Sequence, residues 1–436
     1  MFTPRLTSLL LLTIAPLLPA QSADSLHAEI DRRARELEPQ VVAWRRDFHE
    51  HPELGNREFR TSKIVAEHLQ KLGLEVRTGV AHTGVVGVLK GGRPGPVVAL
   101  RADMDALPVT EEVDLPFKST VKTQYNGQEV GVMHACGHDN HVAILMGVAE
   151  MLTAMKAQLP GTVKFIFQPA EEGPPVGEEG GAPMMLKEGA FENPRVDAVF
   201  GLHVFPMTVG HVEYRPAGIM ASSDNFYITV RGRQTHGALP WNGVDPIVAA
   251  AQIVLGIQTI TSRQTDLTVT PAVVTVGIFR GGIRTNIVPD SVELAGTIRT
   301  FDEGVRAQLH ERLTRTAESI AAASGATASV RIQKMTPVTY NDPALTDRMV
   351  PTLKRVLGDA RVKLGTPTTT AEDFSFFQQA APGLFIFLGI TPPDRVGAAA
   401  PNHSPRFYAD EGGLLPGMRV MANLAIDYLV SGSTRQ

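Results

Sequence analysis

The order of helical and strand patterns along this 436-residue chain limits its possible folds more than any other feature. Between residues 217 and 332 the order is strand, helix, strand, strand, helix, strand, which is typical of a ferredoxin-like α+β module. Before and after this module, apolar strands alternate with helices, as in α/β layer domains. We therefore predict a main catalytic domain of residues 24–216 and 333–436, with a smaller domain of residues 217–332 inserted in it. The length of the chain also favours two domains.

The main domain is predicted to be α/β, with a mixed, largely parallel sheet flanked by helices. Short apolar runs that end in polar residues give its expected strands, at residues 85–89, 97–102, 162–167 and 198–202. A helix is expected from residue 141 to 157, because Pro160 and the following glycine then stop the pattern.

The first residues of the chain resemble a signal peptide. Arg5 provides a positive charge, residues 6–18 are apolar, and Ala20 and Ala23 both offer small-residue cleavage sites. A membrane anchor is disfavoured, because the apolar run is shorter than the ~20 residues that a span needs and contains a proline. We expect residues 1–23 to be removed from an exported protein, periplasmic or secreted, that has no membrane span in its mature form.

Charge and motifs exclude several classes of function. The formal net charge is −4 and no run of Lys or Arg is present, so no nucleic-acid partner is expected. The chain has neither a Gly-x-Ser-x-Gly nucleophile motif nor a glycine-rich phosphate-binding loop. Serine hydrolases built on that motif and nucleotide-binding enzymes of these kinds are therefore disfavoured.

Acidic and imidazole side chains follow three of the predicted strands. Asp103 and Asp105 follow one strand, Glu171 and Glu172 follow the next, and His203 follows the third. In open α/β sheets the ligand crevice lies at the carboxyl ends of the strands. We therefore expect these groups to lie together at one edge of the sheet.

The densest group of chemically active residues is at 134–141, just before the predicted helix. It contains three His, Asp139 and Cys136, the single cysteine of the chain. A thiolate and the imidazole of His138, two residues apart in a glycine-containing turn, can bind one cation. Asp139 or Asp105 could orient an imidazole by a hydrogen bond. The alternative is an inert buried thiol, since a lone cysteine forms no intrachain disulfide.

The glutamate pair suits a division of labour in metal-assisted hydrolysis. Adjacent glutamates are usually a solvated surface, but Glu171 and Glu172 follow an apolar strand and Pro169, which places them at the crevice. One carboxylate can bind a metal while the other takes a proton from water.

These motifs resemble those of the aminoacylase and metallocarboxypeptidase family with paired metal ions, and most of all its branch of hippurate hydrolases and indole-acetyl-amino-acid hydrolases. The resemblance spans nearly the whole mature chain. The motifs that carry it are residues 51–54 (HPEL), 103–108 (DMDALP), 133–141 (MHACGHDNH), 168–172 (QPAEE), 201–203 (GLH), 286–289 (NIVP), 371–374 (AEDF) and 403–405 (HSP).

The resemblance implies a site with two divalent metal ions per chain. Its metal ligands would be Cys136, His138, Glu172, His203 and His403. Glu171 would be the general base that activates water and then protonates the leaving amine, and Asp103 would support the ligands. Zinc or manganese is expected, and such mixed ligands would also accept cobalt or nickel. Without the resemblance, His403 would be interpreted as part of a surface turn.

By the same resemblance, the inserted module is a lid or dimerisation domain. His236 would be catalytic and polarise the scissile carbonyl from the lid side, within one chain or across a homodimer formed through the module. Asn286 and Arg299 are candidates for binding the substrate carboxylate, although an arginine that ends a strand is more often a surface charge. Residues 173–181 carry extra Pro and Glu, and either narrow or acidify the entrance or form an inert loop.

The expected function is metal-dependent hydrolysis of the amide bond of small N-acyl amino acids, hippurate-like or related amide conjugates. Two rival functions are also hydrolytic: an exported dipeptidase or carboxypeptidase, and a peptidoglycan-directed deacylase. A non-catalytic metal-binding homologue is disfavoured because Glu171, the expected base, is present.

Overall fold

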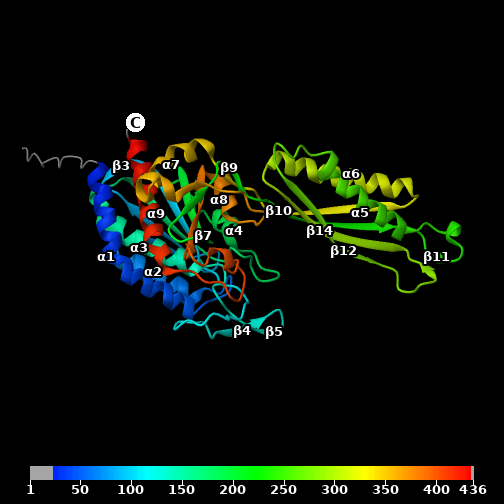
Figure 1. The fold of residues 1–436 in the computed structure, drawn as a ribbon, viewed down its shortest axis with the longest axis horizontal. Helices are drawn as coiled ribbons and strands as arrows, with labels where there is room; N and C mark the ends of the chain where they lie inside the picture. The colour runs from blue at the N-terminus through cyan, green and yellow to red at the C-terminus, as the bar shows by residue number, and fades with distance from the viewer. Residues whose placement is uncertain (1–22, 434–436) are drawn as a thin grey trace, which may run out of the picture.

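The computed structural model describes residues 23–433, which form a larger and a smaller lobe (Figure 1). The larger lobe holds both ends of the described chain, and a central segment forms the smaller lobe. The expected signal peptide lies outside the described residues, except for Ala23, where helix α1 (Ala23–Glu50) begins. Within residues 23–433, no helix is both long enough and apolar enough to span a membrane.

An eight-stranded sheet forms the centre of the larger lobe, in the order β1-β2-β6-β3-β7-β18-β8-β17. These strands are β1 (Glu75–Val80), β2 (Gly84–Lys90), β3 (Arg93–Asp103), β6 (Pro160–Gln168), β7 (Ala198–Thr208), β8 (Val212–Tyr214), β17 (Val362–Leu364) and β18 (Gly383–Thr391). The central strands β6, β3, β7 and β18 are parallel, whereas the pairings β1–β2, β2–β6 and β18–β8 are antiparallel. The predicted mixed sheet is therefore confirmed.

Helices cover both faces of this sheet, as predicted. One hydrophobic cluster joins the sheet to α1 and to α2 (Phe59–Lys71), α3 (His138–Ala154), α7 (Pro343–Leu357) and α9 (Leu414–Ser433). A second cluster joins the sheet to α4 (Gly181–Lys187) and α8 (Phe374–Ala380). Because the sheet is covered on both sides, a central strand such as β18 is buried at every position.

The smaller lobe is a four-stranded antiparallel sheet, in the order β12-β14-β10-β15, with two helices packed on it (Figure 1). In chain order its elements are β10 (Ser223–Arg231), α5 (Pro246–Arg263), β12 (Ala272–Gly281), β14 (Ser291–Thr300), α6 (Glu303–Ala323) and β15 (Thr327–Thr336). The lobe has its own hydrophobic cluster, whose members all come from these elements and the turns beside them. Its proposed role as a lid stays a prediction.

Several details differ from the sequence-based expectation. Helix α3 begins at His138 rather than at residue 141, and strand β7 continues past His203 to Thr208. Short elements that the sequence did not predict include β4 (Lys122–Tyr125), β5 (Gln128–Gly131), β9 (Ala217–Met220), β11 (Thr235–His236), β13 (Ile287–Val288) and β16 (Thr339–Asn341), as well as β8, α4 and α8. The hairpin of β4 and β5 projects from the larger lobe (Figure 1) and is largely polar, which hides it from a search for apolar periodicity.

Candidate metal centre and active site

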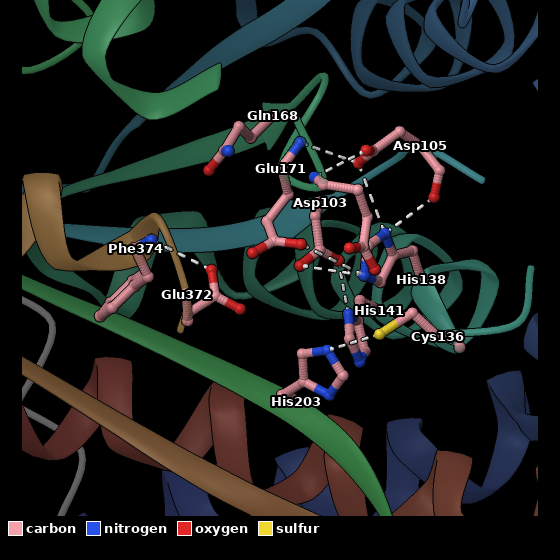
Figure 2. Close-up of polar contacts among 12 residues, drawn as sticks. Asp103, Asp105, Cys136, His138, His141, Gln168, Glu171, His203, Glu372 and Phe374 are labelled. Carbon is pink, nitrogen blue, oxygen red and sulfur yellow. Dashed lines mark hydrogen bonds and ion pairs between the residues drawn. The ribbon is translucent and has the colours of Figure 1, made fainter. Parts of the chain in front are cut away.

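The carboxyl ends of the central strands bring the acids and imidazoles together. Strand β3 ends at Asp103, β6 ends just before the glutamate pair, and β7 carries His203. Helix α3 presents His138 to the same place (Figure 2). The grouping that the strand-end pattern predicted is thus present in the structure.

The turn that precedes α3 depends on Gly137. Its φ of 89° lies in the left-handed region, and a Cβ atom at this position would lie 2.3 Å from Cγ2 of Val204. Only glycine combines this conformation with such a close approach. The turn allows Cys136 and His138 to face the same space beside His203.

Cys136, His138 and His203 form a buried group of potential ligands. Sγ of Cys136 lies 3.3 Å from Nε2 of His203, and one ligand atom from each of the three residues lies within 4.8 Å of the others. Nδ1 of His138 lies 2.8 Å from the carbonyl oxygen of Asp105, and Nδ1 of His203 lies 2.8 Å from that of Val204. Because a carbonyl oxygen only accepts, each Nδ1 donates and each Nε2 keeps a lone pair for a cation.

Glu172 and His403 form a second group that shares Cys136 with the first. Oε1 of Glu172 lies 2.9 Å from Nε2 of His403 but has no partner in hydrogen-bond geometry among the described residues. Nε2 of His138 is also buried without such a partner. His403 has a φ of 70°, a conformation that is uncommon for a residue other than glycine and that clusters at functional sites.

The carboxylate of Asp105 fixes the turn that carries the glutamate pair. Its two oxygens accept hydrogen bonds from the backbone N–H groups of Glu171 and Glu172, each at 3.0 Å. The preceding residue, Ala170, has a φ of 50° and donates its N–H to Glu58 at 2.9 Å. This turn directs Oε2 of Glu171 to within 3.8 Å of Nε2 of His138, with the glutamate side chain only 8% exposed.

Sequence reasoning missed a buried charge network around Arg101. The guanidinium donates to Gln168 at 2.8 Å and to Glu372 at 2.8 Å, and it also contacts Asp103. One oxygen each of Asp103, Glu171 and Glu372 lies within 4.8 Å of the others. The available signal was an arginine inside an otherwise apolar strand, together with the AEDF motif at residues 371–374, to which the sequence analysis gave no role.

His141 was part of the predicted cluster but received no role. Its Nδ1 lies 2.5 Å from Oδ1 of Asp103, and its Nε2 accepts the backbone N–H of Val204 at 2.9 Å. Both ring nitrogens are therefore engaged. His141 ties α3 to strands β3 and β7 instead of offering a lone pair to a cation.

Asp139 was predicted to orient an imidazole of the metal site, but in the structure it contacts residues of α1 instead. Its Oδ2 lies 2.9 Å from Nε of Arg45 and 2.8 Å from Nδ1 of His49, both on α1. The imidazole that Asp139 orients is therefore that of His49. The nearby His138 is oriented by the backbone of Asp105.

The electrostatics of the site favour a bound cation. Burial raises the pKa of Glu171 well above its usual value, and Glu372 and Glu172 add to this effect. Burial also raises the pKa of Glu372 to about 8, although Arg101 opposes the rise. Burial, Glu172 and Glu171 raise the pKa of the Cys136 thiol. The protein alone does not neutralise this many buried acids, whereas a divalent cation would stabilise their charged forms.

The donor set also fits a divalent transition metal. It combines one thiol, imidazoles whose Nε2 atoms face the shared space, and a carboxylate with an unpaired oxygen. Sulfur and imidazole ligands suit zinc, and a mixture with carboxylate accepts several related ions.

The two substrate-binding candidates lie far apart in the structure. Arg299 is half-buried and lines a cavity of about 650 Å³, which is also lined by Cys136, Glu171 and His403. Asn286 is exposed beside His236 of β11, since the N–H of Gly237 donates to the carbonyl of Asn286 at 2.8 Å. Strand β11 lies at the distal end of the smaller lobe (Figure 1), so one chain does not bring His236 or Asn286 to the ligand group.

Comparison with known proteins identifies the family. Residues 99–427 match the family model described as peptidase family M20/M25/M40. The chain belongs to this family. Its M20 relatives include a thermostable carboxypeptidase of Saccharolobus solfataricus, 43% identical over 90% of this chain and 96% of the relative. They also include the IAA-amino acid hydrolase ILR1-like 2 of Arabidopsis thaliana, 38% identical over 90% of this chain and 86% of the relative.

Solved structures of the M20 family share the fold. A Bacillus subtilis protein described as a dinuclear metal-binding peptidase from this family is 34% identical, with a TM-score of 0.76 over 91% of this chain and 99% of its own. The family resemblance seen in the motifs is thereby confirmed. The M20 chain described here is a metal-dependent amidohydrolase, and the buried donors at the sheet edge are its candidate metal centre.

Proposed function

We propose that this M20 amidohydrolase hydrolyses the amide bond of N-acyl amino acids, using two divalent metal ions and Glu171 as the base. The observation that carries the proposal is the position of the Glu171 carboxylate. This carboxylate lies beside the grouped ligand atoms. Glu171 and Arg299 line the same cavity.

The five residues proposed as ligands divide into two groups that meet at Cys136. Cys136, His138 and His203 form one group, and Cys136, Glu172 and His403 form the other. Two divalent ions, zinc or manganese in the first place, would lower the pKa of the attacking water and polarise the amide carbonyl.

Glu171 would transfer the proton during hydrolysis. Its carboxylate takes a proton from the attacking water and gives it to the amine nitrogen as the carbon–nitrogen bond breaks. The carboxylate of Asp105 accepts the backbone N–H of Glu171 at 3.0 Å. Arg101 binds Asp103 and Glu372, which lie beside Glu171. These contacts hold the base in position beside the ligand group.

Arg299 would bind the α-carboxylate of the substrate. Burial lowers the pKa of its guanidinium, an effect that Asp224 opposes, so an anionic partner in the cavity would be favourable. With the substrate carboxylate bound at Arg299, the amide bond would lie closer to Glu171 and Glu172 than the carboxylate does. Release of an amino acid from this side of the bond is consistent with the names of the carboxypeptidase and the IAA-amino acid hydrolase to which the chain is similar.

The carboxypeptidase relative supports a second candidate, hydrolysis of peptides from their carboxyl end. Both candidates use the same carboxylate-binding arginine and the same base. They differ in what lies on the acyl side, a simple acyl group or a peptide with a charged amine.

The test compares N-acetyl, N-benzoyl and indole-acetyl amino acids with free dipeptides of the same carboxyl-terminal residue. The proposal expects kcat/KM at least tenfold higher for the N-acyl compounds. Faster cleavage of the dipeptides would assign the peptidase function instead. A protein that cleaves neither set after loading with zinc or manganese would contradict both.

His236 would act in a homodimer formed through the smaller lobe. Within one chain His236 is exposed and remote from the ligand group, and the lobe carries exposed apolar side chains on its edge strand β12 and on α5. The most exposed of these side chains are Leu255, at 71%, and Val248, at 53%. Exposed apolar patches of this kind mark interaction surfaces.

Mixing two inactive variants tests this arrangement. Glu171→Gln and His236→Ala are each expected to be inactive, and dimers containing one copy of each would hold one complete site if His236 acts across the dimer. Activity should therefore return on mixing under exchange conditions. If the mixture stays inactive although mixed dimers are present, His236 does not act across the dimer.

Export of the protein is proposed from the N-terminal pattern of Arg5 and the apolar residues 6–18. Sequencing the N-terminus of the mature protein tests it. Cleavage after Ala20 or Ala23 is expected, and an intact N-terminus in the cytosol would refute export.

A further inference from the structure

A second cavity, of about 450 Å³, lies on another side of the glutamate turn. Its walls come from the segment before α2, the residues after β3, the β4–β5 hairpin and the loop after the glutamate pair. It shares one lining residue with the first cavity, Glu172. The two cavities therefore meet at the proposed metal centre.

The side chains around the centre place the cavities on opposite sides of it. Asp105 lines the second cavity, whereas His203 and Glu372 line the first. In Figure 2, Asp105 lies on one side of Glu171 and His138, and His203 and Glu372 lie on the other. A substrate whose scissile bond sits at the glutamate pair can therefore extend into both cavities.

Three charged side chains in the wall of the second cavity are already paired or hydrogen-bonded within the protein. Arg57 is paired with Glu178 at 2.5 Å, and Lys122 is paired with Glu129 at 3.2 Å. The carboxylate of Glu53 accepts the backbone N–H groups that begin α2, at 2.9 and 2.8 Å.

The rest of the wall combines apolar side chains with uncharged polar side chains of the hairpin. The apolar side chains include Leu54, Leu107, Val121 and Val132. Thr123 and Tyr125 of β4 extend the wall toward solvent. Such a wall favours an uncharged, mostly apolar group over a charged one.

The loop of residues 173–181 shapes this cavity. Gly173 and Pro175 line it, and Glu178 of the same loop is bound by Arg57 and by the side-chain amide of Asn56 at 3.1 Å. Gly173 and Pro175 thus add uncharged surface to the cavity wall, and the charge of Glu178 is paired with Arg57.

We propose that the second cavity is the acyl-binding site and that the preferred substrates carry an extended apolar acyl group, such as a medium-chain fatty acyl group. This inference rests on the proposed function. With the amino-acid carboxylate at Arg299 in the first cavity, the acyl group leaves the scissile carbonyl on the other side of Glu172. An acetyl group would leave most of a 450 Å³ cavity unused, whereas a longer chain would transfer apolar surface from water.

A chain-length series on the full-length, metal-loaded enzyme tests the proposal. N-acetyl, N-butanoyl, N-hexanoyl and N-octanoyl derivatives of one amino acid are compared by kcat/KM. Each methylene that enters the cavity should raise kcat/KM by about fourfold, the value for burial of one CH₂ group. A flat or falling series would overturn the acyl-site proposal while leaving the proposed function intact. Hydrolysis of no member would refute the proposed function itself.

A variant that fills the cavity locates the effect. Thr123→Trp adds a large side chain to the half-buried lining position of β4, and Gln128→Trp adds the same side chain to an exposed, non-lining position of β5. Thr123→Trp should lower kcat/KM for the N-octanoyl substrate at least tenfold more than kcat/KM for the N-acetyl substrate. Gln128→Trp should change neither.

Two outcomes would overturn the assignment. Equal loss of activity toward acetyl and octanoyl substrates in Thr123→Trp would indicate a general defect or a product exit path. Unchanged octanoyl kinetics in Thr123→Trp, with the variant shown to be folded by thermal unfolding, would place the acyl group elsewhere.

Discussion

Replacement of Glu171 by Gln separates catalysis from metal binding and from folding. The substitution keeps the shape of the side chain and removes the only function proposed for it, acceptance and donation of a proton. Glu171 is 8% exposed and lies 3.8 Å from Nε2 of His138. The neighbouring acid Glu372 is held in place, because its Oε1 accepts hydrogen bonds from Arg101 at 2.8 Å and from the N–H of Phe374 at 3.0 Å.

The expected magnitude follows from loss of general base catalysis. Such a loss typically lowers kcat by about 10²–10⁴-fold, or about 3–5 kcal/mol of barrier. Stability should not fall, because burial, Glu372 and Glu172 raise the pKa of Glu171 and so penalise its charged form in the metal-free protein. The amide removes that penalty.

The assay combines steady-state hydrolysis of the best N-acyl substrate, elemental analysis and thermal unfolding of the metal-free protein. Glu179→Gln is the matched control, since Glu179 is an exposed loop residue paired with Lys187 at 2.9 Å. The account predicts low kcat, full metal content and an unchanged or higher Tm for Glu171→Gln only. A kcat within tenfold of the native value would refute the assignment of Glu171 as the base.

Two further predictions concern folding. Gly137→Ala should lower the free energy of unfolding by about 1–3 kcal/mol more than Gly177→Ala, because both glycines have a φ of 89° but only the Cβ at 137 would meet Val204; equal costs in chemical denaturation would contradict the steric argument. Burial would raise the pKa of Asp224, but its hydrogen bonds with Arg306, at 2.6 and 2.8 Å, hold that pKa below its usual value. Asp224→Asn should therefore cost about 3 kcal/mol at pH 7, and this cost should shrink as pH falls below about 4, since a depressed pKa in the folded state gives stability that acid removes; a cost that is constant with pH would refute the ionic contribution.

The parts of the fold that the sequence predicts are those with strong periodicity or local geometry. The central strands and the two helices of the smaller lobe have apolar patterns that burial explains. Cys136 and His138 are two residues apart in one turn, and the glutamate pair follows a buried strand. The sequence alone therefore indicates that these side chains lie close together. Short polar elements such as β4 and β5 lack an apolar period and were missed.

The remaining parts of the site depend on contacts that no local pattern reveals. Arg101 and Glu372 are 271 positions apart, so no local pattern in the sequence indicates their hydrogen bond. His403 was found through family resemblance, since its turn alone is typical of a surface. The start of α3 was misplaced because its first turn is polar, yet His138 and Asp139 are fully buried by the site itself. The second cavity arises from four separate segments and has no sequence signature.

The metal content of the mature protein tests the central claim most directly. Elemental analysis of the native chain and of Cys136→Ser, each with hydrolysis measured before and after chelation, addresses both metal groups because Cys136 belongs to both. The account predicts about two divalent ions per native chain, activity that chelation removes and metal restores, and a clear loss of metal in the variant. Full hydrolytic activity in native protein freed of metal would contradict it.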